Sequence, residues 1–329
     1  MDHPLKKLIQ KRGALVIDGA MSTALEELGC DLNDPLWTAK VLLKEPDKVR
    51  IVHEKYFDAG ANVAITASYQ ASELGFAQRG LASETSRLLI QQSVKMAQIA
   101  RNNSLEKNPS IERNDLLIAG SCGPYGAYLA NGAEYTGDYS LSTEEFKNFH
   151  RLRIEALVEA GVDLIAVETQ PRLDEVQAIL DLLDEYDISA WVTFTLKDEY
   201  HLPDGTTLET VTALCEENPS IDAFGFNCVE RELVSKAIRK ISSISSKPLI
   251  VYPNSGETYD PTTKQWEKTL HSVNWHHFVN EWHSLRALCI GGCCRTLPSD
   301  ILTIANLMKN YQRYIPNSGS IIILYHFRT

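Results

Sequence analysis

The chain has 329 residues, 44% of them hydrophobic and 23% charged, which is typical of a globular protein with one large domain or two small ones. Its 32 basic and 43 acidic residues give a formal net charge of −11, so nucleic-acid binding has no electrostatic support. The sequence has no apolar signal segment and no apolar run near the ~20 residues of a membrane span, so we expect no membrane association. Seven cysteines, an odd number, favour a reducing compartment over a disulfide framework and predict a cytoplasmic protein.

Eight short apolar runs recur along the chain, and amphipathic stretches separate them. Continuous runs of this length are typical of parallel strands that are buried on both faces. In chain order they are 14–18, 62–66, 116–120, 163–168, 190–196, 222–227, 248–252 and 287–291. Eight strands alternating with helices over about 300 residues predict an α/β fold, a single (β/α)8 TIM-type barrel.

The intervals between these runs have helical patterns. After the third run, Ser142 and Glu145 form a capping box, apolar residues recur on one face, and Gly161 ends the helix. The pair His276 and His277 beside a tryptophan predicts the start of another helix and a structural role, because no acid or cysteine nearby in sequence matches the pair as a metal or catalytic partner.

A doubly wound sheet is the alternative fold. That fold would require a glycine-rich phosphate turn after the first strand, and this turn has only Gly19, so the barrel is favoured. No linker rich in proline, glycine or serine divides the chain, and we expect one barrel domain over residues 1–310. The tail at 311–329 has no place in the strand–helix alternation, and neither its role nor the oligomeric state is predicted.

The C-terminal ends of barrel strands carry the chemistry of this fold. Two long segments rich in turn residues follow such ends, at 121–140 and 253–274, and long structured loops on one face are usually functional. The first segment contains four tyrosines, which either line a site or pack within the loop. These are Tyr125, Tyr128, Tyr135 and Tyr139.

Three cysteines follow strand ends on this same face. Cys228 follows the sixth strand, and Cys293 and Cys294 follow the eighth. Adjacent side chains diverge in a strand, so both thiols can converge only if the backbone turns, and Gly291 and Gly292 supply that freedom. Three thiolates with an open fourth position are typical of catalytic zinc. The alternative is three small buried residues, but their matched strand ends favour a metal.

The segments IDGAMSTALEELG, GSCGPYGAYLANGAEYTGDY, VETQP, GFNC, PNSGE and GGCCRT resemble, in this order, the homocysteine S-methyltransferase family. The resemblance runs from about Val16 to Ile304. It implies Zn²⁺ held by Cys228, Cys293 and Cys294, with the homocysteine thiol as fourth ligand and methionine as product. The loop after the third strand is similar to the branch of the family that uses sulfonium donors, so we expect S-methylmethionine, with S-adenosylmethionine as a second donor.

Polar residues at other strand ends are candidates for substrate binding. Asp18 ends the first strand directly before Gly19, and Glu168 ends the fourth. A carboxylate at either place can hold an amino-acid ammonium group, and the family resemblance implies homocysteine binding at these positions. The alternatives are a helix N-cap for Asp18 and an ion pair at the rim for Glu168. Asn227 and Asn254 are weaker candidates, because asparagine also suits turns.

Two functions from different classes fit these features. The first is a zinc-dependent methyltransferase, and the second is a non-catalytic zinc-binding barrel with a storage or regulatory role. Carboxylates at strand ends together with all three cysteines favour the enzyme. The remaining cysteines are expected to be packing residues, with Cys289 as the only substitute metal ligand. They are Cys30, Cys122, Cys215 and Cys289.

Overall fold

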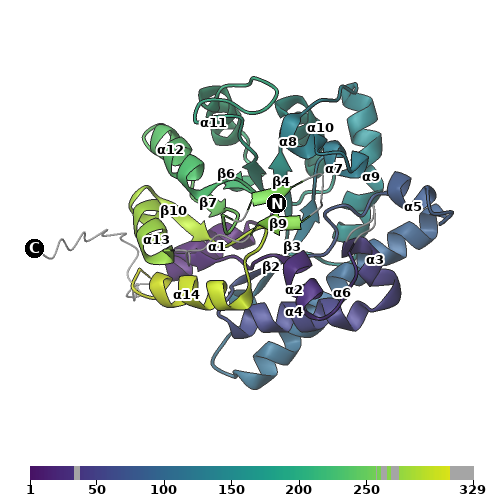
Figure 1. Ribbon diagram of the computed structural model, residues 1–329, viewed down its shortest axis with the longest axis horizontal. Coiled ribbons are helices and arrows are strands. Elements are labelled where there is room, and N and C mark those ends of the chain that lie inside the picture. Colours follow the sequence, from purple (N-terminus) through teal and green to yellow (C-terminus); the bar gives the residue numbers. More distant parts are fainter. Residues whose placement is uncertain (33–37, 257, 261–264, 268–273, 312–329) are drawn as a thin grey trace, which may run out of the picture.

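The computed structural model describes residues 1–32, 38–256, 258–260, 265–267 and 274–311. Eight parallel strands form one sheet in the order β1-β10-β7-β6-β5-β4-β3-β2, and a bridge between Ile17 and Val63 joins the two edges, so the sheet closes into a barrel (Figure 1). The strands are β1 Leu15–Val16, β2 Val63–Ile65, β3 Leu117–Cys122, β4 Leu164–Gln170, β5 Ala190–Phe194, β6 Ile221–Asn227, β7 Leu249–Tyr252 and β10 Ala287–Ile290. Each predicted strand is present, so the barrel prediction is confirmed and the doubly wound alternative is wrong.

Helices surround the strands (Figure 1). They are α1 Pro4–Arg12, α2 Met21–Glu27, α3 Thr38–Lys44, α4 Pro46–Asp58, α5 Glu73–Ala77, α6 Ser83–Lys107, η1 Arg113–Asp115, α7 Tyr125–Leu129, α8 Ala133–Thr136, α9 Thr143–Glu159, α10 Leu173–Glu185, α11 Leu208–Glu217, α12 Arg231–Ile241, α13 Trp275–Ser284 and α14 Pro298–Met308. Among the described residues, no helix combines the length and apolar character that crossing a membrane requires.

Helix α9 forms where its sequence pattern predicts. The Ser142 hydroxyl accepts a hydrogen bond from the backbone N–H of Glu145, whose carboxylate accepts one from the backbone N–H of Ser142. Phe146 and Leu152 are buried on the face toward the barrel, and Gly161 has a φ of 79° just after the helix. At α13, Asn274 caps the helix start that the two histidines predict.

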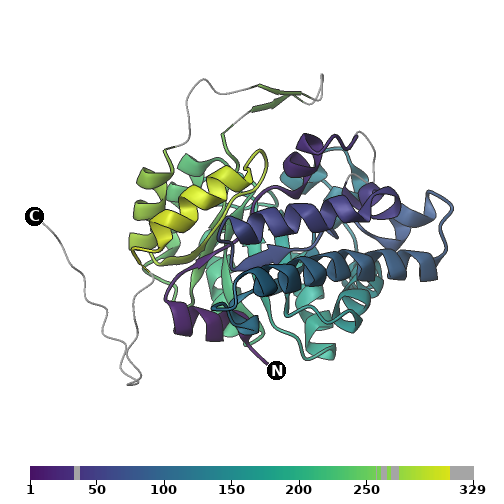
Figure 2. The ribbon, with the colours of Figure 1, turned by 90° about the horizontal axis from the view of Figure 1, so that it is seen from below.

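Alternation along the strands separates two hydrophobic layers. Every second residue points into the barrel, and these side chains form a core distinct from the layer between strands and helices. Leu5, Leu8 and Ile9 of α1 pack into this inner core and close the N-terminal end of the barrel. Figure 2 shows α1 at one end of the molecule and strands β8 (Thr258–Asp260) and β9 (Gln265–Glu267) at the other.

The segment 253–274, predicted as a long loop, contains the antiparallel pair β8–β9 in its described part. Residues 257, 261–264 and 268–273 of this segment lie outside the described residues. The same is true of 312–329, so the tail beyond the barrel is not tested by the structure.

We expect Gly225→Ala to destabilise the barrel strongly. A Cβ atom at Gly225 of β6 would collide with the carbonyl oxygen of Ile250 in the neighbouring strand β7. The two strands cannot move apart without breaking the hydrogen bonds between them. We therefore expect the substitution to lower the free energy of unfolding by about 3 kcal/mol. Urea unfolding should give a lower midpoint, whereas Gly132→Ala, where a Cβ meets nothing within 4 Å, should cost only the strain of its positive φ. An unchanged midpoint for Gly225→Ala would contradict this register.

Candidate metal and substrate site

Polar residues replace apolar ones as the inward positions approach the C-terminal ends of the strands. The inner positions of β4 run from Leu164 and Ala166 to Glu168, and those of β7 run from Ile250 to Tyr252. All five side chains are buried. The alternation therefore places a buried polar layer above the apolar inner core, at the end of the barrel where this fold binds its substrates.

Glu168 lies at the centre of this layer. Its carboxylate accepts hydrogen bonds from the Ser121 hydroxyl of β3 and, at 3.1 Å, from the Tyr252 hydroxyl of β7. Burial raises the pKa of Glu168 to about 7, although both hydrogen bonds favour the charged form. No ion pair to Glu168 is found within the described residues, so the alternative of a rim ion pair is wrong.

Tyr252 links Glu168 to the next strand. Its hydroxyl accepts a hydrogen bond from Trp191 Nε1 at 3.1 Å and lies 2.7 Å from Thr193 Oγ1, and both of these residues belong to β5. The carboxylate of Glu168 is thus fixed by side chains from three strands. Sequence reasoning missed Ser121, Thr193 and Tyr252. The inward parity of Thr193 and Tyr252 on predicted strands was a usable signal, whereas Ser121 lies one residue beyond the predicted third strand and belongs to β3 in the structure.

Asp18 stands at the end of β1, where Oδ2 accepts a hydrogen bond of 2.9 Å from the backbone N–H of Ile65. The N-cap of α2 is Ala20 and has no side-chain bond, so the N-cap alternative for Asp18 is wrong. Burial raises the pKa of Asp18 well above its ordinary value, and the charge of Glu168 adds to the rise. These two buried carboxylates therefore repel one another and favour a shared cation between them.

Gly19 is required by packing at its position. A Cβ atom there would come within 2.8 Å of the Tyr56 ring and 3.0 Å of Thr296 Oγ1. Tyr56 lies beneath the turn, where its hydroxyl is 3.0 Å from the carbonyl oxygen of Ala20. The glycine thus lets the chain after β1 pass close to α4 and to the segment after β10.

Asn227 holds the end of β4 in place. Its Oδ1 accepts a hydrogen bond from the backbone N–H of Thr169, and its Nδ2 donates to Thr169 Oγ1, both at 2.8 Å. Thr169 has a φ of 58° and Cys228 a φ of 53°. Both values are uncommon for residues other than glycine and tend to occur at functional sites. Asn227 therefore orients the residues that flank Glu168 and Cys228.

The three predicted cysteines lie together at the C-terminal face. The sulfur atoms of Cys228, Cys293 and Cys294 are all within 4.8 Å of one another, and those of Cys228 and Cys294 are 3.6 Å apart. Cys228 and Cys293 are joined as a disulfide, with Cα atoms 5.4 Å apart. The sequence did not predict this bond. Metal binding requires thiolates, so the disulfide must be reduced before these residues can act as ligands.

The backbone turns near Cys293 and Cys294 without using the conformational freedom of the two glycines, contrary to our expectation. Neither Gly291 nor Gly292 has a positive φ, and Arg295, with a φ of 65°, makes the turn instead. The Thr296 hydroxyl closes it by donating to the carbonyl oxygen of Cys293 at 2.6 Å. Added Cβ atoms would collide with Ile17 or Thr296, so these glycines serve close packing against neighbouring chain segments.

The segment after β7 runs against the cysteines. The backbone N–H of Cys293 donates to the carbonyl oxygen of Pro253 at 2.7 Å, and that of Ser255 donates to the carbonyl oxygen of Cys294 at 3.0 Å. Between them, Asn254 has a buried Oδ1 atom with no hydrogen-bond partner in the described structure. A buried amide oxygen without a partner is costly, so Asn254 is suited to receive a donor group from a ligand.

The four tyrosines of the 121–140 segment divide into two groups. Tyr125, Tyr128 and Tyr139 pack with one another and with Phe149 of α9 or its neighbours. Tyr135 of α8 instead extends toward the cysteines, with its hydroxyl 4.0 Å from Cys228 Sγ. Sequence patterns could not separate these roles.

The remaining cysteines are buried and lie apart from the three-cysteine cluster. They are Cys30, Cys122, Cys215 and Cys289. Cys289, the substitute ligand considered above, packs among the apolar residues of the inner barrel core. Burial of Cys30, Cys215 and Cys289 agrees with the expected packing role, whereas Cys122 also lies with its Sγ atom 3.5 Å from His150 Nδ1.

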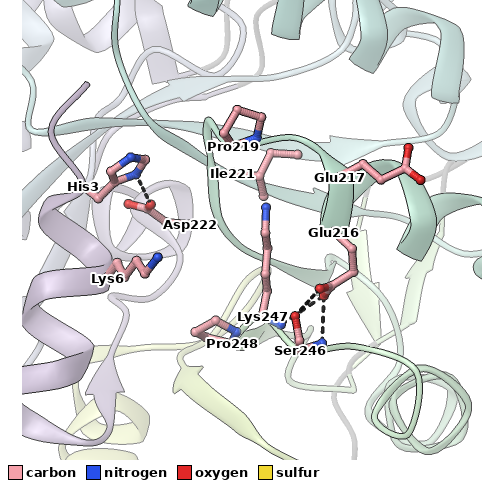
Figure 3. A pocket seen from close by; sticks show the side chains of 10 residues that line it. All are labelled: His3, Lys6, Glu216, Glu217, Pro219, Ile221, Asp222, Ser246, Lys247 and Pro248. Carbon is pink, nitrogen blue, oxygen red and sulfur yellow. Dashed lines mark hydrogen bonds and ion pairs between the residues drawn. The ribbon is translucent and has the colours of Figure 1, made fainter.

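A cavity of about 490 Å³ lies at the opposite end of the barrel (Figure 3). Lys6 of α1 and the starts of β6 and β7 line it. Two of the carboxylates that line it have partners within the protein: Asp222 Oδ1 lies 2.6 Å from His3 Nδ1, and Glu216 accepts hydrogen bonds from the backbone N–H groups of Ser246 and Lys247. The cavity is therefore separate from the polar layer and the cysteines.

The fold and this site together define a (β/α)8 barrel with a thiol cluster that can hold a metal ion and a carboxylate pair that can hold a cation. The model of the homocysteine S-methyltransferase family matches residues 15–308. A homocysteine S-methyltransferase of Escherichia coli is 48% identical over 305 residues, which cover 92% of this chain and 98% of that protein. Homocysteine S-methyltransferase YbgG of Bacillus subtilis is 46% identical over 306 residues, covering 92% and 97%.

The metallated form of the homocysteine methyltransferase MmuM from E. coli has a closely similar solved structure. Its TM-score is 0.84 at 46% identity, and the match covers 92% of this chain and 99% of that one. The chain therefore belongs to the homocysteine S-methyltransferase family.

Proposed function

We propose that this chain is an enzyme that transfers a methyl group from a sulfonium donor to the thiol of L-homocysteine and so forms methionine. The observation that carries the proposal is the presence, at one end of the barrel, of three cysteine sulfur atoms and two buried carboxylates with no ion pair in the described structure. The first feature suits the acceptor's thiol and the second its ammonium group. The names of relatives from E. coli and B. subtilis support homocysteine as acceptor.

Cys228, Cys293 and Cys294 fit a zinc ion by the chemistry and spacing of their sulfur atoms. Thiolates suit zinc, and tetrahedral Zn–S bonds of about 2.3 Å hold two sulfurs about 3.8 Å apart. The 3.6 Å between Cys228 Sγ and Cys294 Sγ is close to that spacing. Three protein ligands leave a fourth position for the acceptor thiol. When bound, zinc lowers the pKa of a coordinated thiol, so that homocysteine is held as a nucleophilic thiolate.

The remaining site residues orient the amino-acid part of homocysteine. Asp18 and Glu168 hold its ammonium group, which offsets the repulsion between their buried carboxylates. The Oδ1 atom of Asn254, which has no partner in the described structure, accepts a hydrogen bond from the substrate, and the backbone at Gly19 lies beside Asp18. Asn227 acts indirectly by fixing the ends of the strands that carry Glu168 and Cys228. Anchoring both ends of the acceptor restricts its sulfur to one direction of attack.

The transfer itself is a displacement at the methyl carbon. The acceptor thiolate forms the new S–C bond with its own electron pair, and the pair of the breaking S–C bond stays on the donor sulfur, which leaves as a neutral thioether. No proton moves in this step, because the thiol proton was lost on binding. The part of the protein is to align both sulfur atoms with the methyl group and to exclude water.

A sulfonium is the donor class that fits this site. Its methyl group is already activated, and its positive charge is attracted by a thiolate centre of net negative charge in a low-dielectric site. A quaternary ammonium such as betaine is also cationic but is a poorer methyl donor. S-methylmethionine is the proposed preferred donor, giving two methionines per turnover, and S-adenosylmethionine the second.

We expect methionine to form from homocysteine with S-methylmethionine, more slowly with S-adenosylmethionine, and not with betaine. The measurement is methionine production by reduced, zinc-loaded protein with each donor at equal concentration. Activity with betaine and with neither sulfonium would overturn the donor assignment. Stoichiometric zinc without any methyl transfer would favour a non-catalytic zinc-binding barrel.

We further propose that residues 1–310 form the homocysteine-binding barrel and that the enzyme works in the cytoplasm. The family match over residues 15–308 supports the first point. The second follows from the chemistry, because a reducing compartment keeps the three cysteines as free thiols.

A further inference from the structure

Helix α8 lies over the thiol cluster. It is a single turn, Ala133–Thr136, in the segment between β3 and α9, and its Tyr135 hydroxyl reaches to 4.0 Å from Cys228 Sγ. Close packing holds it there, because a Cβ atom at Gly126 of α7 would collide with the backbone of Ala133 and Glu134. The neighbour of Tyr135 in this turn is Glu134, whose side chain the site described above does not use.

The carboxylate of Glu134 lacks a counter-charge. Its Oε2 atom is buried and has no hydrogen-bond partner in the described structure. Burial raises the pKa of Glu134, and only the backbone N–H groups of Gly132 and Glu134 itself oppose that rise. No cationic side chain among the described residues acts on it. Glu134 is half-buried, and a carboxylate oxygen that is buried without a partner is costly unless a ligand supplies the positive charge.

Glu134 also lies near the reacting end of the site. Its charge helps to raise the pKa of the Cys294 thiol to about 11, after burial as the larger cause, and it adds to the rise in the pKa of Tyr69. The unpaired carboxylate is therefore within electrostatic reach of the sulfur cluster, on the side that the 121–140 segment covers. The homocysteine ammonium already has Asp18 and Glu168 deeper in the barrel.

We propose that Glu134 binds the positively charged sulfonium group of the methyl donor above the thiol cluster. A sulfonium has no N–H or O–H to donate, so a carboxylate recognises it through charge alone and needs no hydrogen-bond geometry. The inference rests on the proposed function and identifies the residue that gives the site its preference for a cationic donor.

The reaction removes the charge that Glu134 recognises. The donor enters with one positive charge and leaves as a neutral thioether, because the electron pair of the broken S–C bond stays on its sulfur. Attraction by Glu134 is thus strongest for the bound donor, weaker in the transition state and absent for the product. Such a residue lowers the donor KM without lowering the barrier of the chemical step, so kcat should not fall when it is removed.

Glu134→Gln should raise the KM for S-methylmethionine about tenfold or more, since it removes one short-range charge pair. The change in kcat should stay within about twofold, and the KM for homocysteine and the zinc content should not change. Glu134→Asp keeps the charge, so its donor KM should rise less than that of Glu134→Gln. The matched control is Asp138→Asn, which removes an exposed carboxylate from the same segment. A donor KM that is unchanged in Glu134→Gln, or raised equally in Asp138→Asn, would overturn the inference.

A second donor tests which charge Glu134 binds. Glu134→Gln should raise the KM for dimethylsulfonioacetate by the same factor as the KM for S-methylmethionine. Dimethylsulfonioacetate has a sulfonium but no amino group. A loss confined to S-methylmethionine would mean that Glu134 binds the donor's ammonium group and would overturn the assignment.

Competition with the wild-type protein tests the inference without a variant that has to fold. Choline should inhibit competitively with the donor at least about tenfold better than its neutral isostere 3,3-dimethylbutan-1-ol. Equal inhibition by the two would count against a cation subsite. If the proposed function itself were wrong, the result would be different, because the wild-type protein would then show no activity with either sulfonium donor.

Discussion

The double variant Cys293→Ser, Cys294→Ser should retain no stoichiometric zinc and should have no measurable methyl transfer. It removes two of the three sulfur atoms that lie within 4.8 Å of one another, and a hydroxyl group is a poor substitute for a thiolate. Without the metal, a homocysteine thiol with a pKa of about 8.5 is mostly protonated at neutral pH and is a weak nucleophile. Zinc analysis of reduced, dialysed protein and a methionine assay measure both losses.

Two single variants serve as controls for this result. Cys30→Ser and Cys215→Ser change buried cysteines that lie apart from the cluster, so zinc content should stay near one per chain. The far-UV circular dichroism of the double variant should remain that of the wild type, because neither cysteine is a member of the buried cores and Cys293 only packs against the inner one. Full zinc retention in the double variant would show that the metal is held elsewhere.

Glu168→Gln should have two opposite effects, of which the first is on catalysis. Loss of the charged partner of the homocysteine ammonium should raise the homocysteine KM about ten- to a hundredfold, because a hydrogen bond to a charged group contributes roughly 1.5–3 kcal/mol. Zinc content should not change. Glu144→Gln, which removes an exposed carboxylate from α9, is the control. Normal homocysteine kinetics in Glu168→Gln would assign Glu168 a purely structural role.

The second effect of Glu168→Gln is on stability without substrate. The folded-state pKa of Glu168 is about 7 against an ordinary value of 4.5, so the folded state binds the proton more tightly. This contribution to stability is fully present below pH 4.5 and is lost as the pH rises through 7, at a cost of about 3 kcal/mol. Glutamine stays neutral, so the variant should unfold several degrees above the wild type at pH 8, with the difference shrinking toward pH 4.5. A lower midpoint at pH 8 would contradict the burial argument.

The same pKa predicts the pH dependence of the wild-type enzyme. Below about pH 7, Glu168 is increasingly protonated and cannot pair with the ammonium group, so the homocysteine KM should rise as the pH falls. In Glu168→Gln the part of this dependence that comes from Glu168 should be lost, so the homocysteine KM should vary less with pH than in the wild type. The buried carboxylate of Glu168 thus lowers the stability of the substrate-free protein and strengthens the binding of the substrate.

Much of this protein is determined by its sequence alone. A strand buried on both faces must be continuously apolar, so all eight strands could be located from local residue patterns. Parallel strands in a closed barrel end at one face, and the convergence of Cys228, Cys293 and Cys294 followed from their places after the sixth and eighth strands. A capping box is equally local, and α9 begins where Ser142 and Glu145 predict.

Only the tertiary structure decided the environment of each side chain. Whether Glu168 pairs with a cation or with Ser121 and Tyr252 depends on the register of β3, β4 and β7, which no local pattern contains. The closure of the barrel by α1, the turn at Arg295 and the contact of α8 with Cys228 through Tyr135 depend in the same way on contacts between distant segments. Sequence periodicity specifies which face of an element is buried, but the partner on that face is chosen by packing in three dimensions.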